Sequence, residues 1–237
     1  IVLIHSLIMV RVKSSLFNYI SGKSGNAVFR QMNGKTFYSI RPDSYNISQS
    51  VKAKESRNNF ALAVKFTKEV NKHPALKLVW KRAKLKGTTS YHRIIKHNIK
   101  FIKENSLSVF NIIAPEGEYF PLKSYVISDD SIILELTSGD MKQSSLFQFP
   151  FSLFAVVYLF EPKKKSYEDN LVFSFSTDFS GVLRKDSNSI AVTIPENILS
   201  YFSRYKKCII YFSGVFQNPN SSKLIWTSTF VVEFVPL

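Results

Sequence analysis

The spacing of apolar residues predicts helices in the region 50–105. Apolar side chains recur there every three or four positions, which is the repeat of an amphipathic helix. Pro74 and Gly87 divide the region, because both residues interrupt helices. The predicted helices run from a cap at Ser48 or Ser50 to about Lys72, from Pro74 through Lys84, and from a cap at Thr88 or Thr89 onward.

One face of each predicted helix is apolar, and we expect that face to be buried. The residues in these faces are Phe60, Ala63, Val64, Thr67 and Val70 in the first helix, Leu76, Val79, Trp80 and Ala83 in the second, and Tyr91, Ile94, Ile95, Ile99 and Ile102 in the third. The opposite face of the third helix is polar and mostly basic, so it should face solvent or a charged partner.

From Ser106 onward the apolar repeat shortens to two, which is typical of β-strands separated by turns. Turn residues stand at 115–117, 138–140 and 218–220. The predicted strands are 107–113, 119–127, 131–137, 146–160, 170–178, 188–193, 207–216 and 223–235. A single helical turn is predicted at Pro195–Tyr201.

These patterns together predict an α+β fold. Asn33 and Gly34 lie between two strand-like runs, and an Asn-Gly pair favours the tight turn of a β-hairpin. We therefore expect an N-terminal hairpin and basic helices, followed by an antiparallel β-sandwich of the Ig-like kind. The expected domains are 1–105, with the hairpin and helices, and 106–237, with the β-sandwich.

The charge of the chain is concentrated in its first half. The whole sequence has 32 Lys and Arg against 17 Asp and Glu, a net charge of +15. Residues 1–105 contain 21 of the basic residues and 4 acidic ones, whereas residues 106–237 contain 11 and 13. Such asymmetry indicates an anionic partner for the basic half. The alternative is that the lysines only solvate the outer faces of the helices.

The densest group of cations lies in and around the second and third predicted helices. It consists of Lys81, Arg82, Lys84, Lys86, Arg93, Lys96, Lys100 and Lys103. Clusters of this kind bind polyanions through release of counterions, which requires many cations on one face but no fixed spacing. The partner could be nucleic acid, an anionic lipid surface, an acidic protein or a glycan surface.

The sequence offers little material for catalysis. Cys208 is the only cysteine, and the four histidines all lie in the basic half without the spacing of a metal pair. The segment Ser21–Ser24 ends like a phosphate-binding loop, but Phe17 stands where that motif needs glycine. The acidic pairs at 116/118 and 129/130 lie in turns. We therefore expect no enzymatic activity, no metal and no cofactor.

The first ten residues, Ile1–Val10, are almost entirely apolar but too short to span a membrane, and no other stretch is long enough. A strand that is apolar on both faces favours burial inside a sheet. We predict that this segment adds to a sheet edge of another copy, with Val2, Ile4, Ile8 and Val10 as the assembly residues. The alternatives are an intramolecular edge strand, the remnant of a signal peptide, or translation upstream of a start at Met9.

Several short motifs in residues 13–105 resemble those of a known family. They are Ser21-Gly22-Lys23-Ser24-Gly25-Asn26-Ala27-Val28, Asn33-Gly34-Lys35 to Arg41-Pro42, and Arg57-Asn58-Asn59-Phe60-Ala61. This part of the chain resembles the N-terminal region of an uncharacterised Bacteroidota/Ignavibacteria protein family. The family has no established activity, so the resemblance implies no site residues.

The sequence thus favours binding or assembly over catalysis. The first hypothesis is a structural protein that self-assembles into a filament, sheath or surface layer as a homo-oligomer or homopolymer. The second is a nucleic-acid-binding or ribosome-associated protein that uses its basic helices, and a third is a carbohydrate-active or adhesive β-sandwich. An assembly role implies an extracellular or cell-surface location, and the other roles are compatible with the cytoplasm.

Overall fold

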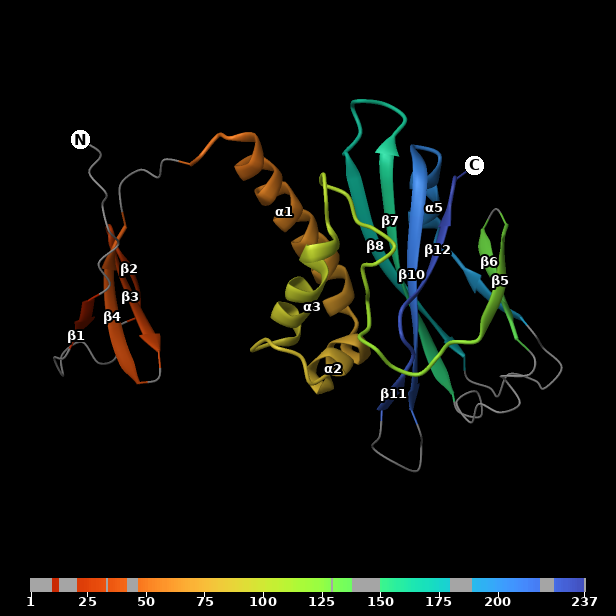
Figure 1. The fold of residues 1–237 in the computed structure, drawn as a ribbon, viewed down its shortest axis with the longest axis horizontal. Helices are drawn as coiled ribbons and strands as arrows, with labels where there is room; N and C mark the ends of the chain where they lie inside the picture. The colour runs from red at the N-terminus through yellow and green to blue at the C-terminus, as the bar shows by residue number, and fades with distance from the viewer. Residues whose placement is uncertain are drawn as a thin grey trace. The chain divides into compact units, whose positions relative to one another are not determined.

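The protein is an α+β protein with antiparallel sheets and two compact units. The computed structural model describes residues 10–12, 21–32, 34–41, 47–128, 130–137, 150–179, 189–217 and 224–236. The first unit is Ile1–Ser50 and the second is Val51–Leu237 (Figure 1). This division differs from the boundary that we expected after Asn105. The helices after Ser50 pack on the sheet of the second unit, so they do not form a domain with the N-terminal strands.

The first unit is built on one four-stranded antiparallel sheet with the order β1-β4-β3-β2. Its strands are β1 (Val10–Val12), β2 (Gly22–Ser24), β3 (Ala27–Met32) and β4 (Lys35–Ile40). Strands β3 and β4 follow one another, with Met32 opposite Lys35. Gly34, in the connection between them, has a φ of 69°, which glycine adopts without steric strain.

Three α-helices begin the second unit. They are α1 (Val51–Lys72), α2 (Pro74–Arg82) and α3 (Ser90–Asn98), and α3 continues into the short 3₁₀ helix η2 (Ile99–Phe101). The predicted cap at Thr89 is confirmed, because its side chain accepts a hydrogen bond from the backbone N–H of His92 at 3.2 Å. Helix α2 ends at Arg82, two residues before the predicted end.

The predicted buried faces of the helices are only partly correct. Phe60 is 51% exposed, whereas Leu62 and Phe66, which we did not place in the stripe, are buried in α1. In α3 only Ile94 of the first three predicted residues is fully buried. The apolar positions of a helix allow more than one stripe, and the layer against which the helix packs decides which one is used.

The rest of the second unit forms two sheets. A five-stranded sheet has the order β11-β10-β7-β8, with β12 also paired to β10, and a three-stranded sheet has the order β5-β6-β9. The elements are β5 (Leu122–Ile127), β6 (Ser131–Leu136), β7 (Phe151–Pro162), β8 (Asn170–Phe179), β9 (Ser189–Thr193), α5 (Glu196–Phe202), β10 (Tyr205–Gln217), β11 (Leu224–Trp226) and β12 (Phe230–Phe234). Helix α5 confirms the predicted helical turn.

Two strand predictions are wrong. Residues 107–113 form no strand but an irregular segment, which hydrogen bonds to the side chains of Asn98 and Thr229 hold in place. The single strand predicted at 223–235 is divided into β11 and β12, because the residues between them turn away to bond with other segments. The hydroxyl of Thr229, for example, accepts the backbone N–H groups of Ile113 and Ala114, each at 3.0 Å.

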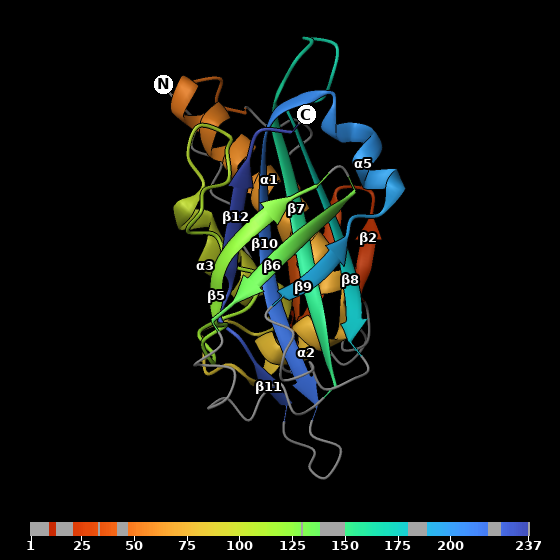
Figure 2. The same ribbon diagram turned by 90° about the vertical axis from the view of Figure 1, so that its right-hand side faces the viewer.

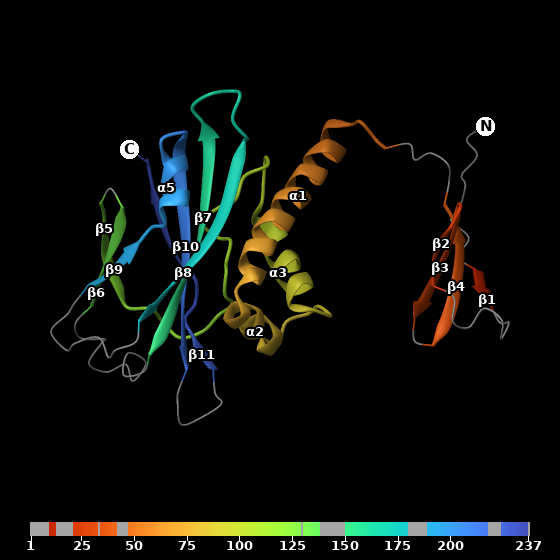
Figure 3. The same cartoon turned by 180° about the vertical axis from the view of Figure 1, so that it is seen from behind.

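The five-stranded sheet is the middle layer of the second unit. The three-stranded sheet crosses one of its faces, and α1, α2 and α3 cover the other (Figures 2 and 3). Strand β7 is therefore buried on both faces. Its Leu153 and Val157 point toward the small sheet, whereas Phe154 and Tyr158 pack under the helices.

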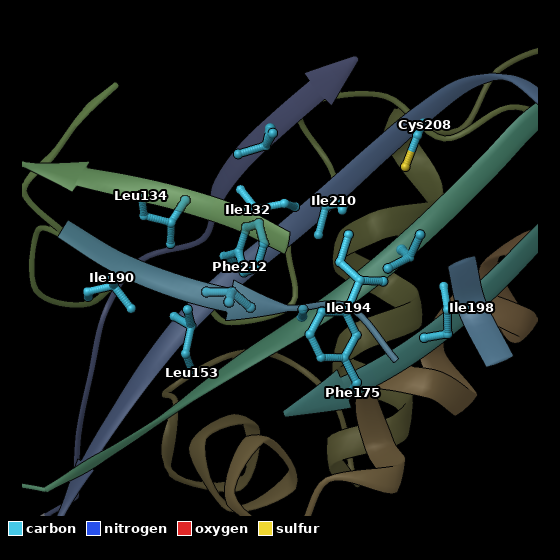
Figure 4. Packing of buried hydrophobic residues seen from close by; sticks show 14 of the residues in the cluster. Ile132, Leu134, Leu153, Phe175, Ile190, Ile194, Ile198, Cys208, Ile210 and Phe212 are labelled. Carbon is cyan, nitrogen blue, oxygen red and sulfur yellow. The ribbon is translucent and has the colours of Figure 1, made fainter. Parts of the chain in front are cut away.

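The core between the two sheets is almost purely aliphatic and aromatic. Figure 4 shows side chains from β6, β7, β9 and β10 that meet there, among them Ile132, Leu134, Leu153, Ile190, Ile210 and Phe212. Cys208 lies in the same core, and its burial raises the pKa of the thiol well above its usual value. The sulfur packs against apolar neighbours, and burial favours the neutral thiol.

Candidate polyanion-binding face

The predicted cations lie at the end of α2, in the α2–α3 connection, along α3 and η2, and, for Lys103, just after η2. Residues 51–105, which form this layer, contain 15 Lys and Arg against 3 acidic residues. All of the predicted cations except Arg93 are exposed. We call the seven exposed ones the basic face: Lys81, Arg82, Lys84, Lys86, Lys96, Lys100 and Lys103.

No carboxylate among the described residues forms an ion pair with a lysine of the basic face. Within the part of the chain that the structure describes there are three ion pairs, Lys65–Glu168, Lys72–Glu69 and Lys207–Glu161, and none includes a lysine of the basic face. An exposed ammonium group without an acidic partner keeps its field directed into solvent. The lysines of the face are therefore electrostatically available to an anion.

Arg93 differs from the other predicted cations, because its guanidinium group donates to backbone carbonyls although its side chain also lines a hollow beside the basic face. Its Nη1 donates to the carbonyl oxygens of Trp80 (2.9 Å), Lys81 (2.8 Å) and Ala83 (2.9 Å), and its Nε donates to that of Gly87 (3.0 Å). These carbonyls include those at the C-terminal end of α2, which lack helical partners and carry partial negative charge. Arg93 is therefore a capping residue for α2.

Two open hollows lie along the basic face and share Lys100. The first has a volume of about 240 Å³ and is lined by Leu85, Lys86, Arg93, Lys96, His97 and Lys100. The second has a volume of about 550 Å³ and is lined by Lys100, Phe101, Lys103, Ser106, Leu107, Ser108 and Phe110. Lys100 borders both hollows, so they adjoin, and we call the lysines that line them, Lys86, Lys96, Lys100 and Lys103, the basic strip.

Aromatic side chains accompany the lysines at the second hollow. Phe110 is 67% exposed, and its ring centroid lies 6.1 Å from that of Phe101. The Nζ atom of Lys100 lies 4.7 Å from the centroid of the Phe101 ring, within the range of a cation–π contact. The sequence did not predict this role for Phe110, because we placed it in a strand.

His97 lines the first hollow and contacts two aromatic rings. Its ring centroid is 6.0 Å from those of both Trp80 and Phe101. Burial lowers the pKa of His97, and the nearby charge of Lys100 lowers it further. The imidazole is therefore neutral near pH 7, and the positive charge of the strip comes from the lysines.

The turn that carries Phe110 is fixed to the layers below it. Ser108 accepts a hydrogen bond on its carbonyl oxygen from the hydroxyl of Tyr211 (2.8 Å), and its N–H donates to Oδ1 of Asn111 (2.8 Å). Asn111 is buried and in turn donates to the backbone oxygen of Asn98 in α3 (3.0 Å). The exposed ring is thus presented by a rigid segment.

The other residues singled out in the sequence lie elsewhere. Val2, Ile4 and Ile8 are outside the described residues, and Val10 lies in β1 opposite Tyr38 of β4. Across the described ranges no group of three or more His, Cys, Asp or Glu side chains is arranged to hold a metal. No helix in those same ranges is long and apolar enough to cross a bilayer.

Comparison of the chain with protein-family models, with curated proteins and with solved structures finds no match.

Proposed function

We propose that the protein is a non-enzymatic nucleic-acid-binding protein that contacts the phosphate backbone through its basic face. One observation carries this proposal: four lysines, Lys86, Lys96, Lys100 and Lys103, border two adjoining hollows and have no carboxylate partner in the described residues. Lysine side chains bind phosphate as mobile point charges and do not read bases by themselves. The contact is therefore made with the backbone and has little sequence preference.

Binding of this kind depends steeply on salt. Each phosphate contact on duplex DNA contributes about 0.9 to the negative slope of log affinity against log salt concentration. A face with several lysines in one strip should give a slope of several units. Hydrophobic association of the same surface would show no such dependence.

The experiment compares two charge reversals of equal size. The test variant is Lys96→Glu/Lys100→Glu, and the control is Lys123→Glu/Lys206→Glu, whose lysines are exposed and lie in β5 and β10, outside the helical layer. Fluorescence anisotropy with a short labelled duplex measures affinity at several salt concentrations. The test variant should lose roughly tenfold or more in affinity and show a shallower salt slope, whereas the control should bind nearly as the original protein does. Equal losses in both variants would contradict a localised face.

Self-assembly is a second proposal, and the open edges of the sheets support it. In the part of the chain that the structure describes, β8 pairs only with β7, and β9 pairs only with β6. Each therefore has an outer edge to which a strand from another copy could add. With it we propose that the two sheets of the second unit form an Ig-like sandwich and that the N-terminal strands form a separate hairpin module. The protein would then be the subunit of a filament, sheath or surface assembly.

A further inference from the structure

The second hollow has a composition that phosphate binding does not require. Phe110 places an aromatic ring in solvent beside Lys100 and Lys103, and Phe101 extends the aromatic surface into the floor of the hollow. A purely electrostatic site would be served by polar residues at these positions. The chemistry of the hollow therefore combines a stacking surface with cations.

We propose that this hollow takes an unpaired nucleobase, so that the protein binds single-stranded nucleic acid more tightly than duplex. This inference rests on the proposed function. A base that stacks on Phe110 leaves its phosphates within reach of Lys100 and Lys103, which border the same hollow. Stacking of a base on an exposed aromatic side chain strengthens binding and tolerates any base. The bases of a duplex are already stacked on one another and cannot occupy the hollow.

The turn that carries Phe110 is already ordered without a ligand. The backbone on either side of it is held by the Ser108–Tyr211 and Asn111–Asn98 hydrogen bonds, so ordering the turn costs little on binding. Asn98 also fixes the segment after Phe110, because its Oδ1 accepts the N–H of Ile112 at 2.7 Å. An exposed apolar side chain on a rigid turn is typical of a contact residue.

A second copy of the chain is a poorer occupant for the same hollow. The lysines that surround Phe110 would face the lysines of the other copy if the surfaces met symmetrically, and like charges repel at such an interface. A negatively charged ligand with flat apolar groups complements both parts of the hollow. Single-stranded nucleic acid has these two properties in every nucleotide.

The test compares Phe110→Ala with a matched control, Phe60→Ala. Phe60 is 51% exposed but lies in α1 and borders neither hollow. Affinity is measured by anisotropy for labelled oligothymidylate and by competition for polyphosphate, which carries the charge but no bases. Phe110→Ala should weaken oligothymidylate binding roughly 5- to 100-fold and leave polyphosphate binding unchanged. Phe60→Ala should change neither.

A tryptophan variant gives a direct readout of stacking. Phe110→Trp should retain the affinity for oligothymidylate, and its fluorescence should be quenched on addition of the oligonucleotide but not of polyphosphate. Equal effects of Phe110→Ala on both ligands, no effect on oligothymidylate, or a Phe110-dependent change in molecular mass by light scattering would each overturn the inference. If the original protein bound neither oligothymidylate nor polyphosphate, the proposed function itself would be refuted.

Discussion

Asn98 and Asn111 are both fully buried, and the side-chain amide of Asn111 donates to the backbone oxygen and to Oδ1 of Asn98, at 3.0 and 3.2 Å. The side chain of Asn98 also donates to the carbonyls of Ile94 and Ile112, each at 3.0 Å. This pair joins α3 to the segment that follows η2. It thereby links the helix that carries Lys96 to the turn that carries Phe110.

Replacement of Asn98 should be strongly destabilising. In Asn98→Ala the part-buried N–H and carbonyl groups of Ile112 lose the side chain that pairs with them, and each unsatisfied group costs about 1–3 kcal/mol when water cannot reach it. We expect a loss of about 3 kcal/mol in the free energy of unfolding, measured by urea denaturation. Asn58→Ala, at an exposed position of α1, is the control and should change stability by less than about 0.5 kcal/mol. Similar values for both variants would contradict the role of the pair.

Arg93→Lys separates the capping role of Arg93 from phosphate binding. Lysine retains the charge but cannot reproduce the fork that reaches several carbonyls at once, so we expect a loss of about 2 kcal/mol in stability. Gly87→Ala should also lower the stability of the folded protein. The added Cβ would lie only 2.7 Å from Cγ of Arg93, so the arginine side chain would have to move. Affinity for heparin should be unchanged in Arg93→Lys. If Arg93→Lys lowered the affinity for heparin without lowering stability, Arg93 would be a polyanion-binding residue and not a cap.

His73 should make stability depend on pH. Its ring packs on Phe154 at a centroid distance of 5.1 Å, and its Nε2 is buried without a hydrogen-bond partner in the described residues. Burial lowers the pKa of His73; Glu69 opposes this shift and Lys72 adds to it. The unfolded chain, with a histidine pKa of about 6.5, therefore binds a proton more readily than the folded protein does.

The stability that comes from neutral His73 is thus fully present above about pH 6.5 and is lost as the pH falls through the lowered pKa. His73→Leu keeps the packing on Phe154 and removes the titrating group. As the pH is lowered from about 7.5 to 5, the urea concentration at the unfolding midpoint should decrease less for this variant than for the original protein. His92→Leu, on an exposed histidine, is the control. Parallel curves for the His73 variant and the original protein would show that His73 titrates equally in both states.

The assembly prediction is tested in the N-terminal segment. Val2→Asp, Ile4→Asp and Ile8→Asp together place charges on the predicted assembly strand, and burial of a charged strand in a neighbouring sheet is unfavourable. By light scattering the original chain should form large homopolymers and the triple variant should be a monomer. The control is Met32→Asp/Ile40→Asp, which alters exposed apolar residues of the first unit and should assemble as the original chain does. Equal masses for the triple variant and the original chain would exclude assembly through this segment.

Local signals in the sequence predicted most of the element boundaries. Pro74 separates α1 from α2, Thr89 caps α3, and the change of repeat near Ser106 separates helices from strands. The concentration of positive charge in the helical layer is likewise a property of the sequence. These features depend on residues close to one another in the chain, so their physical causes are present in any short window.

The tertiary structure alone decided which side of each element is used. The buried face of α1 contains Leu62 and Phe66 because the helix packs on a sheet formed by residues far along the chain. Residues 107–113 were mistaken for a strand because the hydroxyl that holds their backbone belongs to Thr229, more than a hundred positions away. Only that packing exposes Phe110 and directs the guanidinium group of Arg93 to backbone carbonyls, since burial and hydrogen bonding depend on neighbours in space that the local pattern does not contain.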